Sequence, residues 1–164
     1  MEKKLHIIAA GGTFDKQYDE LKGELTFKDS HLPEIMKIVR CTVPYELTFL
    51  PLKDSLNMDD DDREALLEAC RTSEYDLIII IHGTDTMENT AQVIGRATLP
   101  KTVILTGAMV PYSVSGSDAI FNLGTAISYV QAQRTGTYIS MNGRCFPWDD
   151  VKKNRTKGIF EYLR

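Results

Sequence analysis

The sequence predicts an α/β fold with three layers, in which a mostly parallel sheet lies between helices, as in flavodoxin-like and Rossmann-like proteins. Apolar runs typical of strands alternate along the chain with segments of helical periodicity. The run 77–81 is apolar at every position, as expected of a strand that is covered on both faces. The length of 164 residues predicts a single domain that spans residues 1–164.

The first third of the chain predicts a strand, a loop, a helix and a second strand. The apolar run 6–10 is the first strand, and the polar segment 15–28 that follows it is expected to be a mobile loop. A helix is expected to begin near Ser30 or His31. Alternation of apolar and polar residues over 45–49 predicts the second strand.

Four consecutive acids occupy positions 59–62, a run that resembles a metal site. Apolar residues at helical spacing follow it, and acids at the start of a helix interact favourably with the helix dipole. We therefore interpret the run as a helix N-terminus and predict no metal site.

The remaining elements alternate in the same way. Strands are predicted over 77–81, 102–106 and 138–141. Thr86 is placed to cap the helix that follows it, and a loop over 107–117 leads into a long helix.

Composition argues against several classes of protein. A net charge of -4 argues against a nucleic-acid binder. The apolar run at the start is too short for a signal peptide or a membrane span, so we expect a cytoplasmic protein without membrane association. Cys41, Cys70 and Cys145 lie far apart, which is typical of reduced thiols rather than of a disulfide framework or a zinc site.

Two threonine-bearing turns each follow a predicted strand: Gly11-Gly12-Thr13 and the His-Gly-Thr-Asp-Thr run at 82–86. In an open parallel sheet, turns at the carboxyl ends of strands meet in one crevice, where ligands bind. Thr13, Thr84 and Asp85 are then expected in one pocket. Either threonine alone is equally well explained as a helix cap. A hydroxyl is a weak nucleophile until a base or a cation acts on it, so two threonines beside an acid suggest acyl transfer and a hydrolase.

The glycines of these turns bear on the kind of ligand. Gly11, Gly12 and Gly83 allow close approach of the backbone and expose N–H groups that suit an oxyanion or a carboxylate. Phosphate would fit as well, but the chain has neither GxxxxGK[ST] nor GxGxxG, so a nucleotide-binding module is the lesser interpretation. His82 adjoins a buried strand end, where a structural histidine is commoner than a catalytic base.

Several motifs together resemble the bacterial-type (type I/II) L-asparaginases. The Gly-Gly-Thr turn within 9–14 is similar to the first signature of that family, and the run 82–88 is similar to the second. Further matches are residues 54–58, the segment 106–109 with Pro111, and Met141-Asn142 followed by 150–153. The resemblance covers nearly the whole chain and implies the fold of the family's N-terminal domain.

The resemblance implies an amidohydrolase that converts L-asparagine to L-aspartate and ammonia through an acyl-enzyme, without a metal or a cofactor. Thr13 is then the nucleophile. Thr84, Asp85 and Lys153 form a second catalytic group, in which the lysine ammonium favours the alkoxide. Tyr18 matches the tyrosine of a flexible loop that closes on the substrate.

The same resemblance implies the contacts to the substrate. Ser55 holds the α-carboxylate, and Asp85 also pairs with the α-ammonium group. Gly12, Gly83 and Ala108 line the substrate. Without the resemblance, Lys153 would be read as part of an exposed basic run.

The chain departs from the family's pattern at two points. Leu56 takes the place of a small polar residue after the substrate serine. Family members also normally carry a C-terminal domain that completes the site of a neighbouring subunit, whereas this chain stops at Arg164, so we expect at least a homodimer.

Two competing hypotheses stay open. One is hydrolysis of glutamine or another small amide, because one methylene is worth only about 1–3 kcal/mol of discrimination. The other is noncatalytic binding of asparagine or aspartate, although a pure binder has no use for a nucleophile or a lysine.

Overall fold

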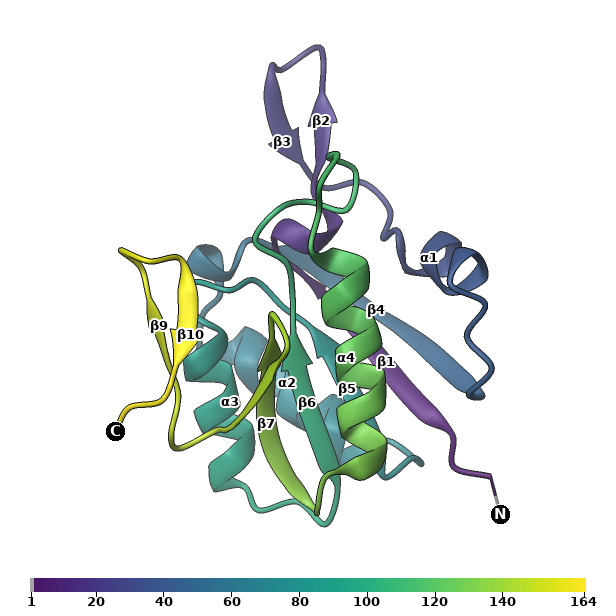
Figure 1. The fold of residues 1–164 in the computed structure, drawn as a ribbon, viewed down its shortest axis with the longest axis vertical. Coiled ribbons are helices and arrows are strands. Elements are labelled where there is room, and N and C mark those ends of the chain that lie inside the picture. The colour runs from purple at the N-terminus through teal and green to yellow at the C-terminus, as the bar shows by residue number, and fades with distance from the viewer. Residues whose placement is uncertain (1) are drawn as a thin grey trace.

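The computed structural model describes residues 2–164, and within this range the main sheet has six strands (Figure 1). From edge to edge they are β4 (Tyr45–Lys53), β1 (Leu5–Gly11), β5 (Leu77–Ile81), β6 (Thr102–Thr106), β7 (Gly136–Met141) and β8 (Arg144–Pro147). The first five run parallel, and β8 is antiparallel to β7. The five parallel strands have the flavodoxin-like order 2-1-3-4-5, which confirms the predicted sheet.

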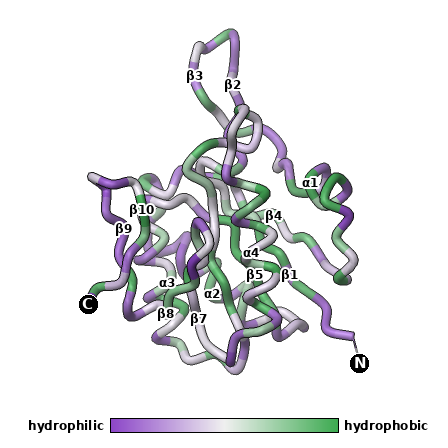
Figure 2. The backbone as a smooth tube through the Cα atoms, in the orientation of Figure 1, coloured by the Kyte–Doolittle hydropathy of each residue, from purple (hydrophilic) through white to green (hydrophobic). Residues whose placement is uncertain are grey.

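Helices cover both faces of this sheet. They are α1 (Leu32–Ile38) and α4 (Ala119–Ala132) on one face, and α2 (Asp60–Thr72) and α3 (Met87–Arg96) on the other. Figure 1 shows α4 crossing in front of the sheet, and Figure 2 shows that β1 and β5 behind it are strongly hydrophobic. The three predicted layers are therefore present.

Strand β5 shows why its sequence lacks alternation. Every one of its residues is buried, with Ile79 facing α1 and α4 and its neighbours Ile78 and Ile80 facing α2 and α3. Successive side chains of a strand point to opposite faces, so a strand covered on both sides needs apolar residues throughout. Each fully buried isoleucine stabilises the fold by roughly 1.5–3 kcal/mol relative to an exposed one.

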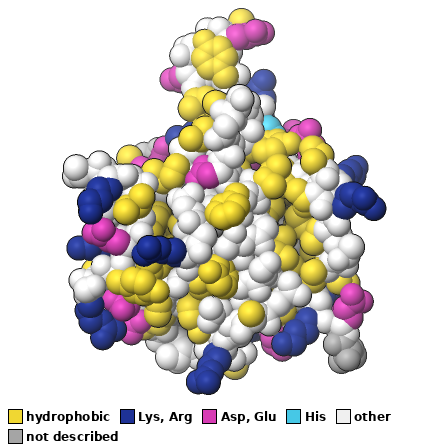
Figure 3. Space-filling model, viewed as in Figure 1, with side chains coloured by type: hydrophobic (Ala, Val, Ile, Leu, Met, Phe, Trp, Pro, Cys, Tyr) yellow, Lys and Arg dark blue, Asp and Glu magenta, His cyan; other side chains and the backbone are white. Residues whose placement is uncertain are grey.

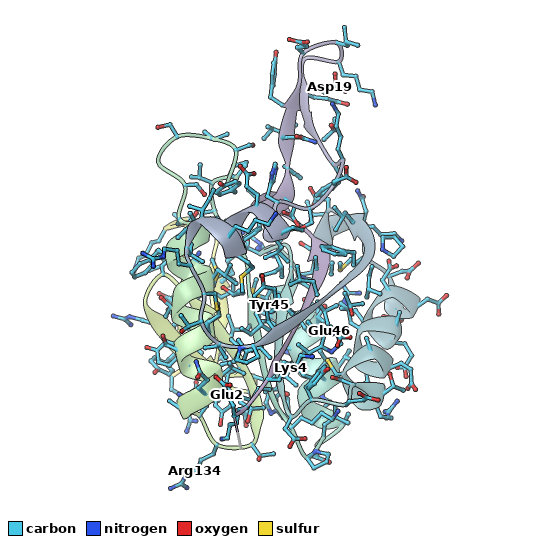
Figure 4. The ribbon with its side chains drawn as sticks, turned by 90° about the vertical axis from the view of Figure 1, so that its right-hand side faces the viewer. Glu2, Lys4, Asp19, Tyr45, Glu46 and Arg134 are labelled. Carbon is cyan, nitrogen blue, oxygen red and sulfur yellow. The ribbon has the colours of Figure 1, made fainter. Side chains whose placement is uncertain are left out.

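The segment 15–28, predicted as a loop, contains regular structure. After a 3-10 turn, η1 (Thr13–Asp15), the chain forms a hairpin of β2 (Gln17–Asp19) and β3 (Glu24–Thr26). The hairpin projects from the body (Figure 1), and Asp19 lies near its far end (Figure 4). The prediction of a loop was wrong, because two three-residue polar strands carry no apolar pattern.

The base of this hairpin is closed by a buried acid. Asp15 accepts hydrogen bonds from the Ser30 hydroxyl at 2.7 Å and from the His31 backbone N–H at 2.9 Å. Burial raises the pKa of the Asp15 carboxyl. The Asp15 side chain thus links the residue that precedes the β2–β3 hairpin to residues 30 and 31, which follow the hairpin directly before α1.

A second small hairpin lies near the C-terminal end, beside α3 in Figure 1, and was not predicted. It pairs β9 (Lys152–Asn154) with β10 (Ile159–Glu161) in antiparallel fashion. Phe160, which is 5 % exposed, belongs to the core cluster on the α2 and α3 face. Because Phe160 is buried there, the hairpin is held against the body and carries its polar residues with it.

The helix starts fit the sequence in one case and differ from it in another. The acids at 59–62 begin α2, where Asp59 and Asp62 form a reciprocal capping box, so their interpretation as a helix start is confirmed. Thr86 precedes α3 but makes no side-chain cap. That prediction was wrong, because the Thr86 hydroxyl donates to the carbonyl of Ser55 at 2.8 Å instead.

The outer face of α4 is unusually poor in charge. The helix contains no charged residue, and Ile120 and Phe121 are partly exposed on it. Figure 3, drawn from this side, shows hydrophobic side chains over the middle of the face and most charged side chains near its rim. Among the described residues, no helix is both long enough and apolar enough to span a membrane.

Candidate active site

Two neighbouring strands bring the predicted turns together. In the parallel pair β1 and β5, Ala9 lies opposite Ile81, so the strands end level. A Cβ added to Gly12, which has a φ of 82°, would lie 2.4 Å from the Cα of Gly83. Only glycines fit this approach. The first and second turns are therefore in direct contact, at the point where the strand order reverses and where ligands bind in such sheets.

Thr13 follows Gly12 and begins η1. Its residue is half-buried, and no other described residue forms a hydrogen bond with its hydroxyl. The turn before it is fixed by the backbone, because the Gly12 N–H donates to the carbonyl of Lys53 at 2.9 Å. A hydroxyl on a fixed turn, free of internal partners, is suited to meet a ligand.

A third turn, after β4, joins the first two. It is the 3-10 turn η2 (Ser55–Asn57), whose Ser55 hydroxyl accepts the Thr86 N–H at 3.2 Å. Ser55 is 1 % exposed, and a Cβ on Gly83 would lie 2.7 Å from its Oγ. The Ser55 hydroxyl is therefore packed beneath the second turn.

An ion pair links the first turn to the third. Lys16 Nζ lies 2.6 Å from Asp54 Oδ2, and the Asp54 side chain also caps the N–H of Leu56. The hydrogen bond from Lys16 lowers the pKa of the Asp54 carboxyl. Because both charges are partly shielded, this pair fixes the two turns relative to each other.

Lys153 makes the central contact of the site. Its Nζ lies 2.9 Å from Thr84 Oγ1 and 2.7 Å from Asp85 Oδ1. The lysine side chain is 8 % exposed, whereas that of Asp85 is 38 % exposed. An ammonium ion that donates to a hydroxyl oxygen favours the alkoxide over the neutral hydroxyl, and the aspartate holds the ammonium in place.

Two further residues anchor the β9–β10 hairpin over the second turn. Glu88, in the first turn of α3, accepts the backbone N–H of Lys153 at 2.6 Å. The guanidinium of Arg155 donates to the backbone carbonyl of Asp85 at 2.7 Å. These bonds fix the β9–β10 hairpin relative to the second turn, and so fix the position from which the Lys153 side chain contacts Thr84.

His82 is part of the scaffold of the second turn. Its Nδ1 lies 2.7 Å from the carbonyl of Gly83, and its Nε2 lies 2.7 Å from the hydroxyl of Thr90. Burial lowers the pKa of the imidazole to about 4. The interpretation of His82 as a hydrogen-bonded structural histidine is confirmed.

Ala108 lies 1 % exposed in the loop after β6, and a polar network holds this loop. Asp118 accepts the backbone N–H groups of Met109 and Val110 at 3.0 Å each, and the amide of Asn142 at 2.9 Å. The pKa of the Asp118 carboxyl is lowered overall, because these hydrogen bonds outweigh the effect of burial, which by itself would raise it. The carboxylate therefore fixes the loop beside the second turn.

Tyr18 is not brought to the other candidate residues. It lies on β2 of the projecting hairpin and is 65 % exposed. The hairpin points away from the sheet in Figure 1. A role for Tyr18 requires this hairpin to move toward the turns.

Sequence reasoning gave no part in the site to Glu88, Arg155, Lys16 or Asp118. Glu88 stands inside the run 82–88, and the sequence already placed it in the first turn of a predicted helix, where an acid is favourable. That position was the only local indication that Glu88 lies beside the second turn. Arg155 belongs to the same basic run of the sequence as Lys153, and its side chain is 59 % exposed. Its contact with Asp85 joins residues 70 positions apart, which no local pattern indicates.

The candidate residues offer no clear metal site. Among residues 2–164, no group of three or more His, Cys, Asp or Glu side chains is arranged to hold a metal ion.

A cavity of about 800 Å³ opens at the opposite end of the parallel strands, away from the turns, where Lys4, Asp76 and Arg134 line it. Figure 4 shows Lys4 and Arg134 at that end, far from the hairpin tip.

Comparison with known proteins places this arrangement in a family. The model of the asparaginase N-terminal domain matches residues 4–161. L-asparaginase 1 of Escherichia coli (strain K12) is 32 % identical over 171 residues, a match that covers 96 % of this chain and 49 % of that protein. The glutaminase-asparaginase of Acinetobacter glutaminasificans is 35 % identical over 86 residues, which cover 50 % of this chain and 25 % of that protein.

Solved structures agree with the sequence comparisons. The thermostable L-asparaginase from Thermococcus kodakarensis superposes with a TM-score of 0.87 at 27 % identity, covering 98 % of this chain and 51 % of that one. The chain thus spans about half the length of the proteins that match it over nearly its whole length. Its sheet order, its two touching turns and these matches agree, and the chain belongs to the asparaginase family, where it corresponds to the N-terminal domain.

Proposed function

We propose that this chain is an amidohydrolase that hydrolyses the side-chain amide of L-asparagine to L-aspartate and ammonia. The observation that carries the proposal is the contact of Lys153 Nζ with both Thr84 Oγ1 and Asp85 Oδ1, at 2.9 and 2.7 Å. A buried ammonium ion on a threonine hydroxyl is an arrangement for moving a proton, and a binding site alone has no need of it. The L-asparaginases among the relatives support the same reaction class.

In this proposal Thr13 attacks the amide carbon. The amide nitrogen takes up the proton that the Thr13 hydroxyl releases and leaves as ammonia, and an acyl ester on Thr13 Oγ1 remains. Thr84 and Lys153 then activate the water that releases aspartate, while Asp85 holds the lysine. N–H groups of the glycine-bearing turns are the donors available to the developing oxyanion.

Substrate contacts follow from the same turns. Ser55, Gly12, Gly83 and Ala108 surround the place where the turns meet, and the proposal assigns them to holding the substrate. Tyr18 completes the site when the β2–β3 hairpin closes. Ser55 is buried beneath the second turn, so in this proposal the third turn has to shift for its hydroxyl to reach the substrate.

The test is ammonia release from L-asparagine by the purified chain. Thr13→Ala and Lys153→Ala are expected to abolish release. Lys152→Ala is the matched control, because Lys152 is the exposed neighbour in the same strand and pairs with Glu161 at 3.5 Å. Equal loss in Lys152→Ala, or full activity in Lys153→Ala, would refute the assigned roles.

L-glutamine is the second candidate substrate, because one relative is named a glutaminase-asparaginase. The same assay with L-glutamine ranks the two amides. No release from either, together with a higher melting temperature in the presence of L-asparagine or L-aspartate, would identify a noncatalytic binding module instead.

A homodimer and a cytoplasmic location are also part of the proposal. The dimer is testable by light scattering of the purified chain. A monomeric mass in the presence and absence of L-aspartate would refute it.

A further inference from the structure

The carboxylate of Asp85 is shared by two cations from one segment. Lys153 Nζ lies 2.7 Å from Asp85 Oδ1, and Arg155 Nη1 lies 3.7 Å from the same oxygen. Arg155 is held there by a second bond, from its Nη2 to the Asp85 carbonyl at 2.7 Å. Its guanidinium is therefore bound to the main chain and the side chain of one residue.

The two cations occupy different sides of the carboxylate. The Lys153 side chain is 8 % exposed and faces the interior, whereas the Arg155 side chain is 59 % exposed and lies on the solvent side. The other acid nearby, Glu88, binds the backbone N–H of Lys153. A ligand that approaches Asp85 from solvent thus meets a carboxylate already flanked by positive charge.

This charge distribution decides which ligand groups suit the position. An ammonium group placed on Asp85 is attracted by the carboxylate, but both cations repel it and so weaken that attraction; such repulsion acts within the screening distance of about 8 Å in physiological salt. A neutral group in the same place avoids the repulsion. A carboxylate on the neighbouring atom is attracted.

We propose that Arg155 is a specificity-determining residue that weakens selection for a free α-ammonium group, so that the site accepts monoamides of dicarboxylic acids that lack it. The simplest member of this class is succinamate, which is L-asparagine with hydrogen in place of the ammonium group. This inference rests on the proposed amidohydrolase function. Its reaction is the same: the C–N bond of the amide breaks, a C–O bond to water's oxygen replaces it, and succinate and ammonium form.

The test compares kcat/KM for L-asparagine and succinamate, which differ only in the ammonium group. Arg155→Gln is expected to raise the ratio of L-asparagine to succinamate roughly two- to fivefold, the size of effect that one exposed charge contact produces. Arg155→Lys, which keeps the charge, is expected to stay near the wild-type ratio. Lys157→Gln removes a charge from the same exposed turn without touching Asp85 and is expected to leave the ratio unchanged.

An unchanged ratio in Arg155→Gln overturns the proposal, and so does an equal loss for both substrates, which would show that Arg155 only positions Asp85. The same comparison is made without turnover, by calorimetric binding of L-aspartate and succinate to the wild type and to Arg155→Gln. If neither amide is hydrolysed, the amidohydrolase function fails, and the binding ratio alone decides the role of Arg155. Absence of succinate binding to the wild type also overturns it.

Discussion

Acidification is expected to destabilise this protein through His82, which no solvent reaches. A carbonyl oxygen only accepts hydrogen bonds, so Nδ1 of His82 must carry the hydrogen that it shares with Gly83. Nε2 is then the acceptor for the Thr90 hydroxyl. Protonation of Nε2 would force the Thr90 hydroxyl to turn from donor to acceptor and would place a charge in the core, and this cost of burying the charge lowers the pKa.

The size of the effect follows from linkage. Between the ordinary pKa of 6.5 and the folded value of about 4, the unfolded chain binds a proton that the folded chain does not, so the free energy of unfolding falls as the pH falls. From pH 7 to pH 5 the loss from this one group is about 2 kcal/mol. For a chain of this size that corresponds to a drop in melting temperature of roughly 4–8 °C.

Urea unfolding at pH 7 and pH 5, followed by the fluorescence of the single tryptophan, Trp148, measures this loss. His82→Gln is the comparison, because glutamine can donate to a carbonyl and accept from a hydroxyl but does not titrate. Other titrating groups are common to both proteins and cancel. The wild type is expected to lose about 2 kcal/mol more than the variant, and equal losses would refute the reasoning.

Three further changes test the site. Gly83→Ala puts a Cβ 2.7 Å from the Ser55 Oγ and is expected to lower the free energy of unfolding by about 1–3 kcal/mol. Gly124→Ala is the control: its Cβ meets nothing within 4 Å in a helix, and it is expected to raise the free energy of unfolding by about 0.5–1 kcal/mol. Chemical denaturation measures both, and equal effects would contradict the packing argument. Glu88→Ala removes the acceptor of the Lys153 backbone N–H and is expected to lower kcat about tenfold with little change in KM. Glu88→Gln keeps an acceptor and is expected to keep most of the activity. An equal loss of kcat in both variants would show that this hydrogen bond is not the cause. Asp118→Ala leaves two backbone N–H groups without their acceptor and is expected to cost about 2–3 kcal/mol in urea unfolding, so a loss below 0.5 kcal/mol would show that water replaces the carboxylate.

The sequence was most informative where burial dictates the residue types. Two predicted strands, Leu77–Ile81 and Thr102–Thr106, agree with the structure at both ends. Their residues are all buried, and continuous burial leaves a continuous apolar run. The β2–β3 hairpin left no such trace, since its strands are short, polar and mostly exposed.

Lys153 shows where local patterns end. It stands in a run with the exposed basic residues Lys152, Arg155 and Lys157, so residue type alone assigned it to the surface. In the structure its ammonium is enclosed, because Glu88 holds the strand and Phe160 holds the hairpin. Contacts between residues 65 to 69 positions apart create this burial, and periodicity over a few turns carries no information on them.

The contact between the turns that carry Thr13 and Thr84 depends on a property of the sheet that neither turn encodes. Both turns follow strands, and parallel strands place such turns on one edge, which the sequence could indicate. Whether they touch depends on which strands are neighbours: β1 lies between β4 and β5, so the first turn contacts both the second turn and the one that carries Ser55. In an order that separated β1 from β5 by one strand, neighbouring strands being about 4.8 Å apart, the two threonines would stand too far apart to act on one amide. The strand order is therefore the step at which three polar turns become one candidate site.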